Sequence, residues 1–171
     1  MKKLIAIIIC FCLFSVSVEA AKIVVEAEKY SSITPSMVKT VETSGSISNN
    51  GFIQIPLRRP HATTQTGPGD SGSCTYKINV TQAGNYSFWF RAWWYDSCGN
   101  SFFVIIDNKP AMYVEDATYQ VWHWVKGPTT ALSVGIHTIK IQNREDGARL
   151  DQFLLNSNSN YVPTRVEVAT Q

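Results

Sequence analysis

Apolar and polar residues alternate with a period of two along most of the chain from residue 23 onward. The stretch 74–80 alternates in this way, a Gln-Ala-Gly-Asn turn follows at 82–85, and the alternation resumes over 86–92. A period of two, bounded by Gly, Pro, Asn and Asp, is typical of half-buried β-strands. Strands are therefore expected at residues 23–28, 52–55, 74–80, 86–92, 102–106, 122–125, 132–134, 136–141 and 150–155.

No segment of the sequence shows the sustained apolar period of 3.6 residues that an amphipathic helix requires. Eight or more short strands at close spacing predict an all-β protein, built as a β-sandwich or a barrel. The stretch 58–72 is rich in Pro, Gly, Thr and Ser, so it is expected to form a surface loop. Residues 161–171 are expected to form either a last strand or a C-terminal tail.

The first 20 residues have the pattern of a secretory signal peptide. Lys2 and Lys3 give a positive start, residues 4–14 are apolar and uncharged, and small residues before position 21 suit a signal peptidase. The apolar run of about 11 residues is shorter than the ~20 that span a bilayer. The sequence therefore predicts cleavage after Ala20, export (secreted, periplasmic or at the cell surface) and a mature chain without a membrane span.

Composition narrows the class of protein and partner. The chain has 44% hydrophobic and 16% charged residues, which predicts a folded core rather than disorder. The mature length of roughly 150 residues fits a single domain, which we assign to residues 21–160. The net charge is +2 and no basic run stands out, which argues against a nucleic-acid partner.

Cys74 and Cys98 are the two cysteines that remain after the predicted cleavage. In an oxidising compartment an isolated pair usually forms a disulfide. A zinc site is the alternative, but it needs more ligands than two distant thiols supply. A disulfide between Cys74 and Cys98 is therefore expected.

Three carboxylates are candidates for metal binding. Glu26 and Glu28 stand at positions i and i+2 of an expected strand, so their side chains share a face. Such a pair is either solvated or shares a cation, and hard oxygen ligands suit calcium. Asp151 lies among core-forming residues of a late strand, where a buried acid needs a partner. The spacing alone leaves a solvated edge-strand face as the alternative.

The chain has five tryptophans. The expected strand at 86–92 predicts on which face of the sheet some of them lie. Alternation puts Trp89, Arg91 and Trp93 on one face and Phe88 and Phe90 on the other. Because both faces of a two-layer sandwich cannot be equally buried, some indoles are expected at the surface. Indole faces stack on the apolar C–H faces of sugar rings, whereas the alternative role is core packing.

Trp94, Trp122 and Trp124 are the candidates for contact with a ligand. Trp122 and Trp124 share a face if their backbone is extended. Two expected loops add polar candidates, which are equally compatible with ordinary surface ion pairs. These polar candidates are Tyr95, Asn100, Arg144, Glu145 and Arg149.

Catalytic motifs are missing from the sequence. His61, His123 and His137 are not at metal-binding spacing, and there is no phosphate-binding loop or nucleophile elbow. Several carboxylates could supply a glycosidase pair, but nothing in the sequence places two of them across a cleft. The chain is therefore not expected to be an enzyme.

The order of short motifs along the mature chain resembles the carbohydrate-binding modules of families 6 and 35. The first of these motifs is the Glu-Ala-Glu segment that opens the mature chain. Each motif alone is unspecific, whereas their order over the whole domain is specific. The segments that carry the resemblance are 26–30, 50–53, 83–86, 90–91, 100–104, 122–124, 135–139, 144–147 and 150–155.

This resemblance implies a jelly-roll β-sandwich of the galactose-binding-domain-like class. It also implies a structural calcium ion held by Glu26, Glu28 and Asp151, together with backbone oxygens. Loops at one end of such a sandwich often present an aromatic platform to the sugar. Arg149 and Asp151 stand where an Asn-rich segment is expected, which leaves the sugar open.

The leading hypothesis is a non-catalytic carbohydrate-binding module of an exported protein that binds a polysaccharide or a surface glycan. The alternative is a structural or protein-interaction jelly roll without a sugar site, acting as an adhesin or an assembly component. It predicts buried tryptophans and no groove. A small glycoside hydrolase or lyase is a third hypothesis, and it predicts paired carboxylates in a cleft.

Overall fold

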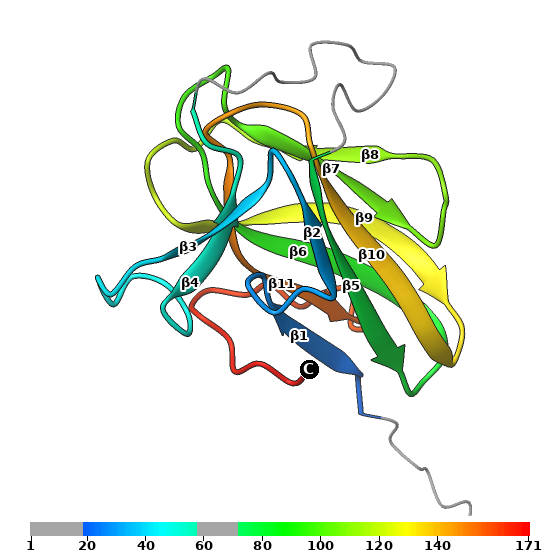
Figure 1. Ribbon diagram of the computed structural model, residues 1–171. Helices are drawn as coiled ribbons and strands as arrows, with labels where there is room; N and C mark the ends of the chain where they lie inside the picture. The colour runs from blue at the N-terminus through cyan, green and yellow to red at the C-terminus, as the bar shows by residue number, and fades with distance from the viewer. Residues whose placement is uncertain (1–18, 58–71) are drawn as a thin grey trace, which may run out of the picture.

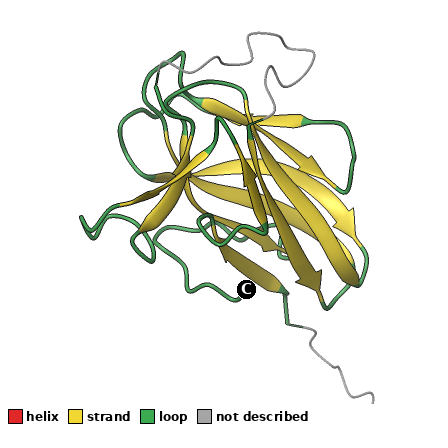
Figure 2. Ribbon diagram, in the orientation of Figure 1, coloured by secondary structure: helices red, strands yellow, loops and turns green. Residues whose placement is uncertain are grey.

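A computed structural model describes residues 19–57 and 72–171 of the chain. These residues form eleven strands in two antiparallel sheets and contain no helix (Figure 2). The two sheets lie face to face as the layers of a sandwich (Figure 1). The prediction of an all-β sandwich is confirmed. Residues 1–18, which hold most of the predicted signal peptide, and most of the predicted loop 58–72 lie outside the described residues.

The larger sheet has six strands and carries the features on which function depends. Its strand order is β3-β4-β11-β6-β9, and β1 also pairs with β11, beside β4 along the same edge. The strands of this sheet are β1 (Lys22–Glu26), β3 (Val38–Val41), β4 (Gly51–Gln54), β6 (Gly84–Trp93), β9 (His123–Leu132) and β11 (Arg149–Asn156).

The smaller sheet has five strands in the order β2-β5-β10-β7-β8. Its three long strands face the larger sheet, and β2 and β8 are short edge strands (Figure 1). The strands of this sheet are β2 (Ser32–Thr34), β5 (Ser73–Val80), β7 (Ser101–Ile106), β8 (Met112–Glu115) and β10 (Gly135–Asn143).

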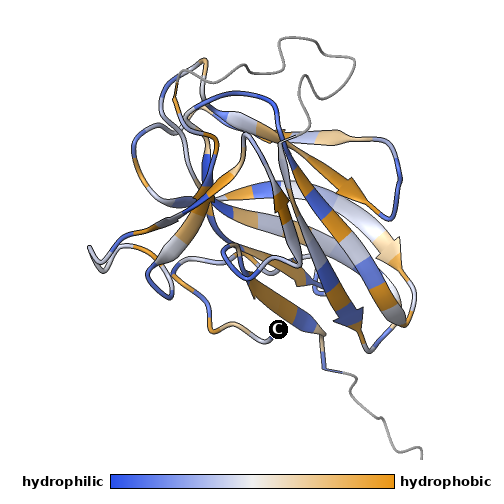
Figure 3. Cartoon of the chain, viewed as in Figure 1, coloured by the Kyte–Doolittle hydropathy of each residue, from blue (hydrophilic) through white to orange (hydrophobic). Residues whose placement is uncertain are grey.

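Aromatic rings from both sheets meet in the core. Phe153 of β11 packs edge to face on Tyr76 of β5, with ring centroids 4.9 Å apart, and stacks on Phe90 of β6 at 6.1 Å. Phe90 in turn meets Phe102 of β7 at 5.4 Å. The alternation of hydrophobic and hydrophilic positions is visible along the long strands (Figure 3). Period-two patterning thus places one residue of each pair between the sheets.

A β-bulge in β11 determines which of its residues face outward. The register with β6 shifts between Leu150 and Gln152, so Leu150 and Phe153 both belong to the core although they are three residues apart. A bulge adds one residue to a strand and re-aims the neighbouring side chains. Arg149 and Asp151 therefore lie on the side of β11 away from the core.

The predicted disulfide is wrong, because Cys74 and Cys98 are both free. Cys74 lies in β5 and its side chain is fully buried in the core. Cys98 lies in the exposed turn after β6, where its backbone N–H donates to Asp96. Sequence spacing could not show that one thiol faces the core while the other faces solvent. Burial raises the pKa of Cys74 to about 12, so it stays a neutral thiol.

The C-terminal residues 157–171 form no strand and lie on the outer face of the larger sheet. Gln152 Nε2 donates to the Glu167 carbonyl at 2.8 Å, and Glu167 N–H donates back to Gln152 Oε1 at 3.0 Å. Thr170 N–H reaches the Val24 carbonyl of β1 at 2.9 Å, which places the C-terminus beside β1 (Figure 1). Of the two expectations for residues 161–171, the structure shows a tail.

The described part of the chain has no helix with the length and hydrophobicity that crossing a bilayer requires.

Candidate functional site

A groove of about 670 Å³ crosses the outer face of the larger sheet. Its floor is formed by Arg91 and Trp93 of β6 and by Arg149 of β11. Three segments form its walls, which are the loop 42–46, the segment 120–122 before β9, and the tail at 165–166. Strand alternation explains the floor, because Ala92, which lies between Arg91 and Trp93 in β6, points into the core.

Aromatic rings hold the arginines of the floor in place. The Arg149 Cζ lies 4.0 Å from the centroid of the Trp93 ring and 5.6 Å from that of Phe52. Arg91 lies over Trp122 at 5.6 Å, and Trp122 meets Phe52 edge to face at 5.6 Å. Two indoles and two guanidinium groups therefore form one contiguous surface at the groove.

Arg91 is neutralised inside the protein. Its Nη1 donates to Asp151 Oδ2 and its Nη2 donates to the Ser46 carbonyl at 2.9 Å. Asp151 is fully buried and also accepts a hydrogen bond from Ser48 N–H at 2.9 Å. Burial raises the pKa of Asp151 to about 6, against the opposing effect of Arg91. This pair ties the loop 42–46, one wall of the groove, to β11.

A second hollow, a polar cleft of about 480 Å³, lies at the end of the sandwich where the loop after β6 meets the loop before β11. Asn100, Asp116, Arg144 and Glu145 are among its lining residues. Arg144 Nη1 donates to Glu145 Oε1 at 2.6 Å, and Asn100 Nδ2 donates to the Asp116 carbonyl at 2.7 Å. Several polar groups of this cleft thus bond to one another, although the buried Nε of Arg144 has no hydrogen-bond partner among the described residues.

The predicted ligand-binding residues do not converge on one place. Trp122 and Arg149 line the groove, whereas Asn100, Arg144 and Glu145 line the polar cleft. Trp94, Trp124 and Tyr95, which were also predicted to bind the ligand, lie in three other environments.

Trp94 is fully buried, so it does not present a ring face to a ligand. Its ring packs on Phe102 at 5.5 Å and its Nε1 donates to Asp116 Oδ1 at 3.0 Å. Trp124 is half-buried beneath the tail and donates to the Arg165 carbonyl at 2.9 Å. Tyr95 is 39% exposed, with its ring 6.3 Å from that of Trp93. Trp94 and Trp124 therefore serve packing in this structure.

Sequence reasoning omitted Trp93 and Arg91 from the candidate site residues. The signal for both was present, since alternation along 86–92 sets them on the face opposite the core. Trp94, one residue later, falls on the core side for the same reason. The wall residues Glu42 and Arg165 carried no comparable signal, because they come from a loop and a tail that folding brings to the sheet.

The environment of Glu26 and Glu28 fits a cation. Glu26 Oε1 accepts hydrogen bonds from Ser48 Oγ at 2.6 Å and Gln152 Nε2 at 3.0 Å, and Glu28 Oε1 accepts one from Asn49 Nδ2 at 2.6 Å. The Oε2 atom of each glutamate is buried and has no hydrogen-bond partner among the described residues. Burial, with a contribution from Glu28, raises the pKa of Glu26. Two buried carboxylate oxygens without partners are what an oxygen-liganded cation satisfies.

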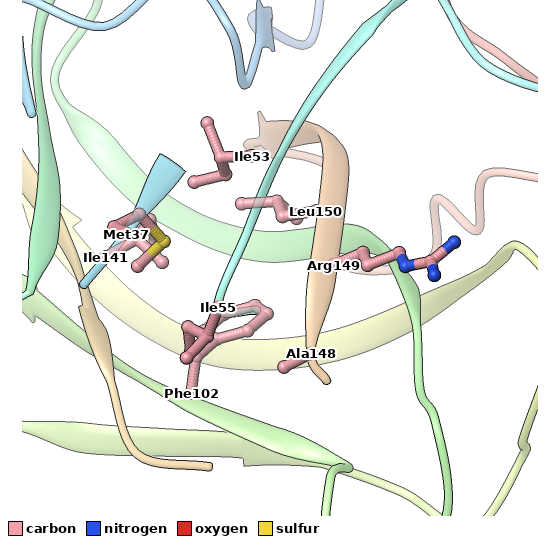
Figure 4. Close-up of a pocket in the computed structure, with 8 residues that line it drawn as sticks. All are labelled: Met37, Ile53, Ile55, Phe102, Ile141, Ala148, Arg149 and Leu150. Atoms are coloured by element: carbon pink, nitrogen blue, oxygen red, sulfur yellow. The ribbon is translucent and has the colours of Figure 1, made fainter. Parts of the chain in front are cut away.

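A small apolar void of about 10 Å³ also lies between the sheets, lined by Ile53, Phe102, Leu150 and other core residues (Figure 4). Its volume is at the limit for a single water, so it is a packing gap and not a ligand site. Figure 4 shows the Arg149 guanidinium directed away from these apolar side chains. Arg149 thus belongs to the groove.

Sequence comparisons match part of the chain. No family model matches the chain. A curated protein of Formosa agariphila, uncharacterized protein P23, is 29% identical over 114 residues, which cover 56% of this chain. The chain spans about 28% of the length of that relative.

Solved structures give a more complete match. A GH26-CBM35 β-(1,4)-mannanase from Podospora anserina superposes with a TM-score of 0.61 at 19% identity, over 83% of this chain and 29% of the mannanase. The carbohydrate-binding module CBM6cm-2 of Cellvibrio mixtus lichenase 5A, in complex with cellotriose, gives 0.56 at 18% identity over 80% of this chain and 95% of the module. The C-terminal CBM6 of a marine laminarinase from Zobellia galactanivorans gives 0.56 at 17% identity, over 80% and 98%.

The two sheets and these matches define a jelly-roll β-sandwich. More narrowly, the chain has the fold of the carbohydrate-binding modules of families 6 and 35. The resemblance expected from the sequence is confirmed at the level of the fold.

Proposed function

We propose that this chain is a non-catalytic carbohydrate-binding module, with its sugar site in the groove of the larger sheet. The observation that carries the proposal is the pair of indoles, Trp93 and Trp122, which line an open groove together with Arg149. A groove of about 670 Å³ falls within the ~300–1,000 Å³ of typical ligand sites. Stacking on the indoles would hold the sugar ring while polar groups fix its orientation.

Binding without cleavage is favoured by the charges of the groove. Glycoside hydrolysis needs a pair of carboxylates that flank the scissile bond. Among the described lining residues, Glu42 supplies the carboxylate of the groove, and the nearby Asp151 is buried against Arg91. The predicted signal peptide would place this activity outside the cytoplasm.

A structural calcium ion belongs to the same proposal. Glu26 and Glu28 would hold it through the two buried Oε2 atoms that have no partner among the described residues. Asp151 directs its carboxylate to Arg91 and Ser48 in this structure, so neutral oxygens would complete the coordination unless Asp151 reorients. The ion would remove the repulsion between the two glutamates and fix the loop between β3 and β4, whose Ser48 and Asn49 bond to them.

Affinity electrophoresis through gels that contain a panel of polysaccharides tests the binding proposal. We expect the purified protein to be retarded by at least one polysaccharide, and a Trp93→Ala, Trp122→Ala variant to migrate as in an empty gel. Tyr113→Ala is the matched control, because this tyrosine is 55% exposed but lies in β8 of the other sheet. Chemical unfolding shows whether each variant is folded.

Two outcomes would contradict the proposal. Retardation that survives in the folded double variant would move the sugar site away from the groove. A protein that no polysaccharide retards would favour the structural or protein-interaction jelly roll.

A further inference from the structure

The guanidinium of Arg149 is fixed on the floor of the groove by aromatic rings. It lies 4.0 Å from the Trp93 ring centroid and 5.6 Å from that of Phe52. Its side chain leaves β11 on the side opposite Leu150 (Figure 4). Contact between a guanidinium and an aromatic ring restrains the orientation of the planar cation. The guanidinium of Arg149 therefore has a fixed orientation in which its N–H groups can donate hydrogen bonds to a ligand.

Arg149 has no anionic partner of its own in the described structure. No carboxylate of the described residues lies within ion-pair distance of it, and its Nε is buried without a hydrogen-bond partner. Burial lowers the pKa of Arg149, and Glu42 acts in the opposite direction from a distance. Arg91, the neighbouring arginine, has both Asp151 and the Ser46 carbonyl. The two arginines of the floor thus differ in one respect, which is that only Arg91 is neutralised.

The walls of the groove add to this positive charge. Arg165 lines the groove from the exposed tail, and Glu42 lines it from the loop after β3. With Arg91 neutralised by Asp151, Arg149 and Arg165 stand against the single carboxylate of Glu42 among the described lining residues. A partly buried cation without a partner costs free energy, which an anionic ligand group would recover.

We propose that the groove is specific for an anionic polysaccharide, with a carboxylate or sulfate group of the sugar bound by Arg149. The inference rests on the proposed function and names the class of glycan for the same groove. A guanidinium can donate two parallel hydrogen bonds to a carboxylate or to two sulfate oxygens. The guanidinium covers one face of the Trp93 ring, so a sugar residue whose acidic group is bound by Arg149 would contact the part of this indole that is left open, or the neighbouring Trp122 of the same groove.

Matched polysaccharide pairs test the class of ligand. Uronic-acid polymers are compared with their carboxyl-reduced forms, and sulfated polymers with their desulfated forms, by equilibrium binding at low and high salt. We expect the acidic member of at least one pair to bind on the order of tenfold more tightly or better, because a charged hydrogen-bonded contact is lost in its neutral partner. This preference should fall at high salt, and the type of pair distinguishes carboxylate from sulfate.

Variants assign the preference to one residue. Arg149→Gln should bind the acidic and neutral members of the pair about equally. Lys126→Gln removes the same charge from an exposed position of β9 that does not line the groove, and it should keep the wild-type preference. Arg149→Lys, which keeps the charge but not the planar fork, should fall between them. Unfolding curves confirm that the variants are folded.

The possible failures are distinguishable. If the protein binds neutral polysaccharides through Trp93 and Trp122 without preferring any acidic member, the anionic inference is overturned and the proposed function stands. If the preference persists in folded Arg149→Gln, the inference is overturned at this residue. If no member of any pair binds, the proposed function fails and the inference fails with it.

Discussion

At the scale of single residues, His137 and Asp107 form a contact whose protonation the geometry determines. His137 Nδ1 faces Asp107 Oδ2, and its Nε2 lies 2.9 Å from the Ser133 carbonyl. Both partners are acceptors, so both ring nitrogens must donate, which requires the imidazolium form. Burial opposes this charge, but the hydrogen bonds outweigh it and raise the pKa of His137. Asp107 is likewise buried in part, and the bonds from His137 and Thr138 lower its pKa.

The sign of these two shifts predicts a pH window for stability. The contribution of Asp107 to the free energy of unfolding is lost as pH falls through its lowered pKa. The contribution of His137 is lost as pH rises through its raised pKa. The pair should therefore stabilise the fold fully between the ordinary values of about 3.9 and about 6.5. Asp107→Asn is a matched change, since Asn tolerates the positive φ of 49° at this turn.

Urea unfolding of the wild type and of Asp107→Asn across pH measures this contribution. The difference in unfolding free energy should be about 1 kcal/mol, because His137 is buried but Asp107 keeps part of its exposure to water, and it should shrink above the raised pKa of His137. A difference that stays constant from weakly acidic to strongly alkaline pH would show that the charge on His137 does not matter.

At the scale of elements, the packing of β9 on β6 depends on a glycine. A Cβ added at Gly127 would lie 2.4 Å from Cε2 and 3.0 Å from Cδ2 of Phe90. Phe90 cannot retreat easily, because Phe102 and Phe153 pack on its ring. The absence of a side chain at Gly127 therefore allows the close approach of these two strands.

Gly127→Ala should destabilise the protein by about 1–3 kcal/mol, the usual cost of overpacking. Gly84→Ala is the control, because its added Cβ would find its nearest neighbour at 3.9 Å, an ordinary contact. Chemical unfolding of the two variants side by side gives the comparison. Equal effects at the two glycines would mean that β9 can shift relative to Phe90.

The strands show what the sequence could and could not predict about the fold. The long strands follow the period-two pattern and were predicted, whereas the edge strands β2, β3 and β8 have three or four residues each, too few to define a period. The strand β9 was predicted as two segments, since Gly127 and Pro128 interrupt its apolar pattern. Its pairing with β6 tolerates this through a register shift between Ser87 and Trp89.

At the scale of the whole molecule, the proposed calcium site would join the N-terminal strand to the last one. Glu26 ends β1, and Gln152 and Asp151 belong to β11. Ser48, from the loop between β3 and β4, bonds to both Glu26 and Asp151. A cation at Glu26 and Glu28 would therefore stabilise three segments that are distant in sequence.

Removal of calcium should lower the melting temperature. A ligand at 100 times its Kd stabilises the folded state by about 2.7 kcal/mol, which corresponds to roughly 5–10 °C for a chain of this size. Differential scanning calorimetry with and without a chelator measures the shift, and a Glu26→Gln, Glu28→Gln variant should not respond to the chelator. An unchanged melt of the wild type would contradict a calcium ion at this site.

The site was harder to predict than the fold because it depends on position in three dimensions. The sequence indicated that aromatic rings and arginines could bind a ligand, and it placed Trp122 and Arg149 among the candidate ligand-binding residues. Alternation put Trp89, Arg91 and Trp93 on one face of the expected strand, but it could not show that Arg91 and Trp93 line a groove while Trp89 does not. The tail residue Arg165 reaches the groove only through tertiary folding.

The central claim is that sugar binds at the groove, and the indole N–H signals of the five tryptophans test it most directly by NMR. The ligand is an oligosaccharide prepared from a polysaccharide that retards the protein in affinity electrophoresis. Titration with it should shift the signals of Trp93 and Trp122. The signals of Trp89 and Trp124 should move little, because Trp89 is buried and the Trp124 indole N–H is bonded beneath the tail. Shifts confined to Trp94, whose indole N–H bonds to Asp116 of the polar cleft, or no shift with any oligosaccharide of the panel, would contradict the account.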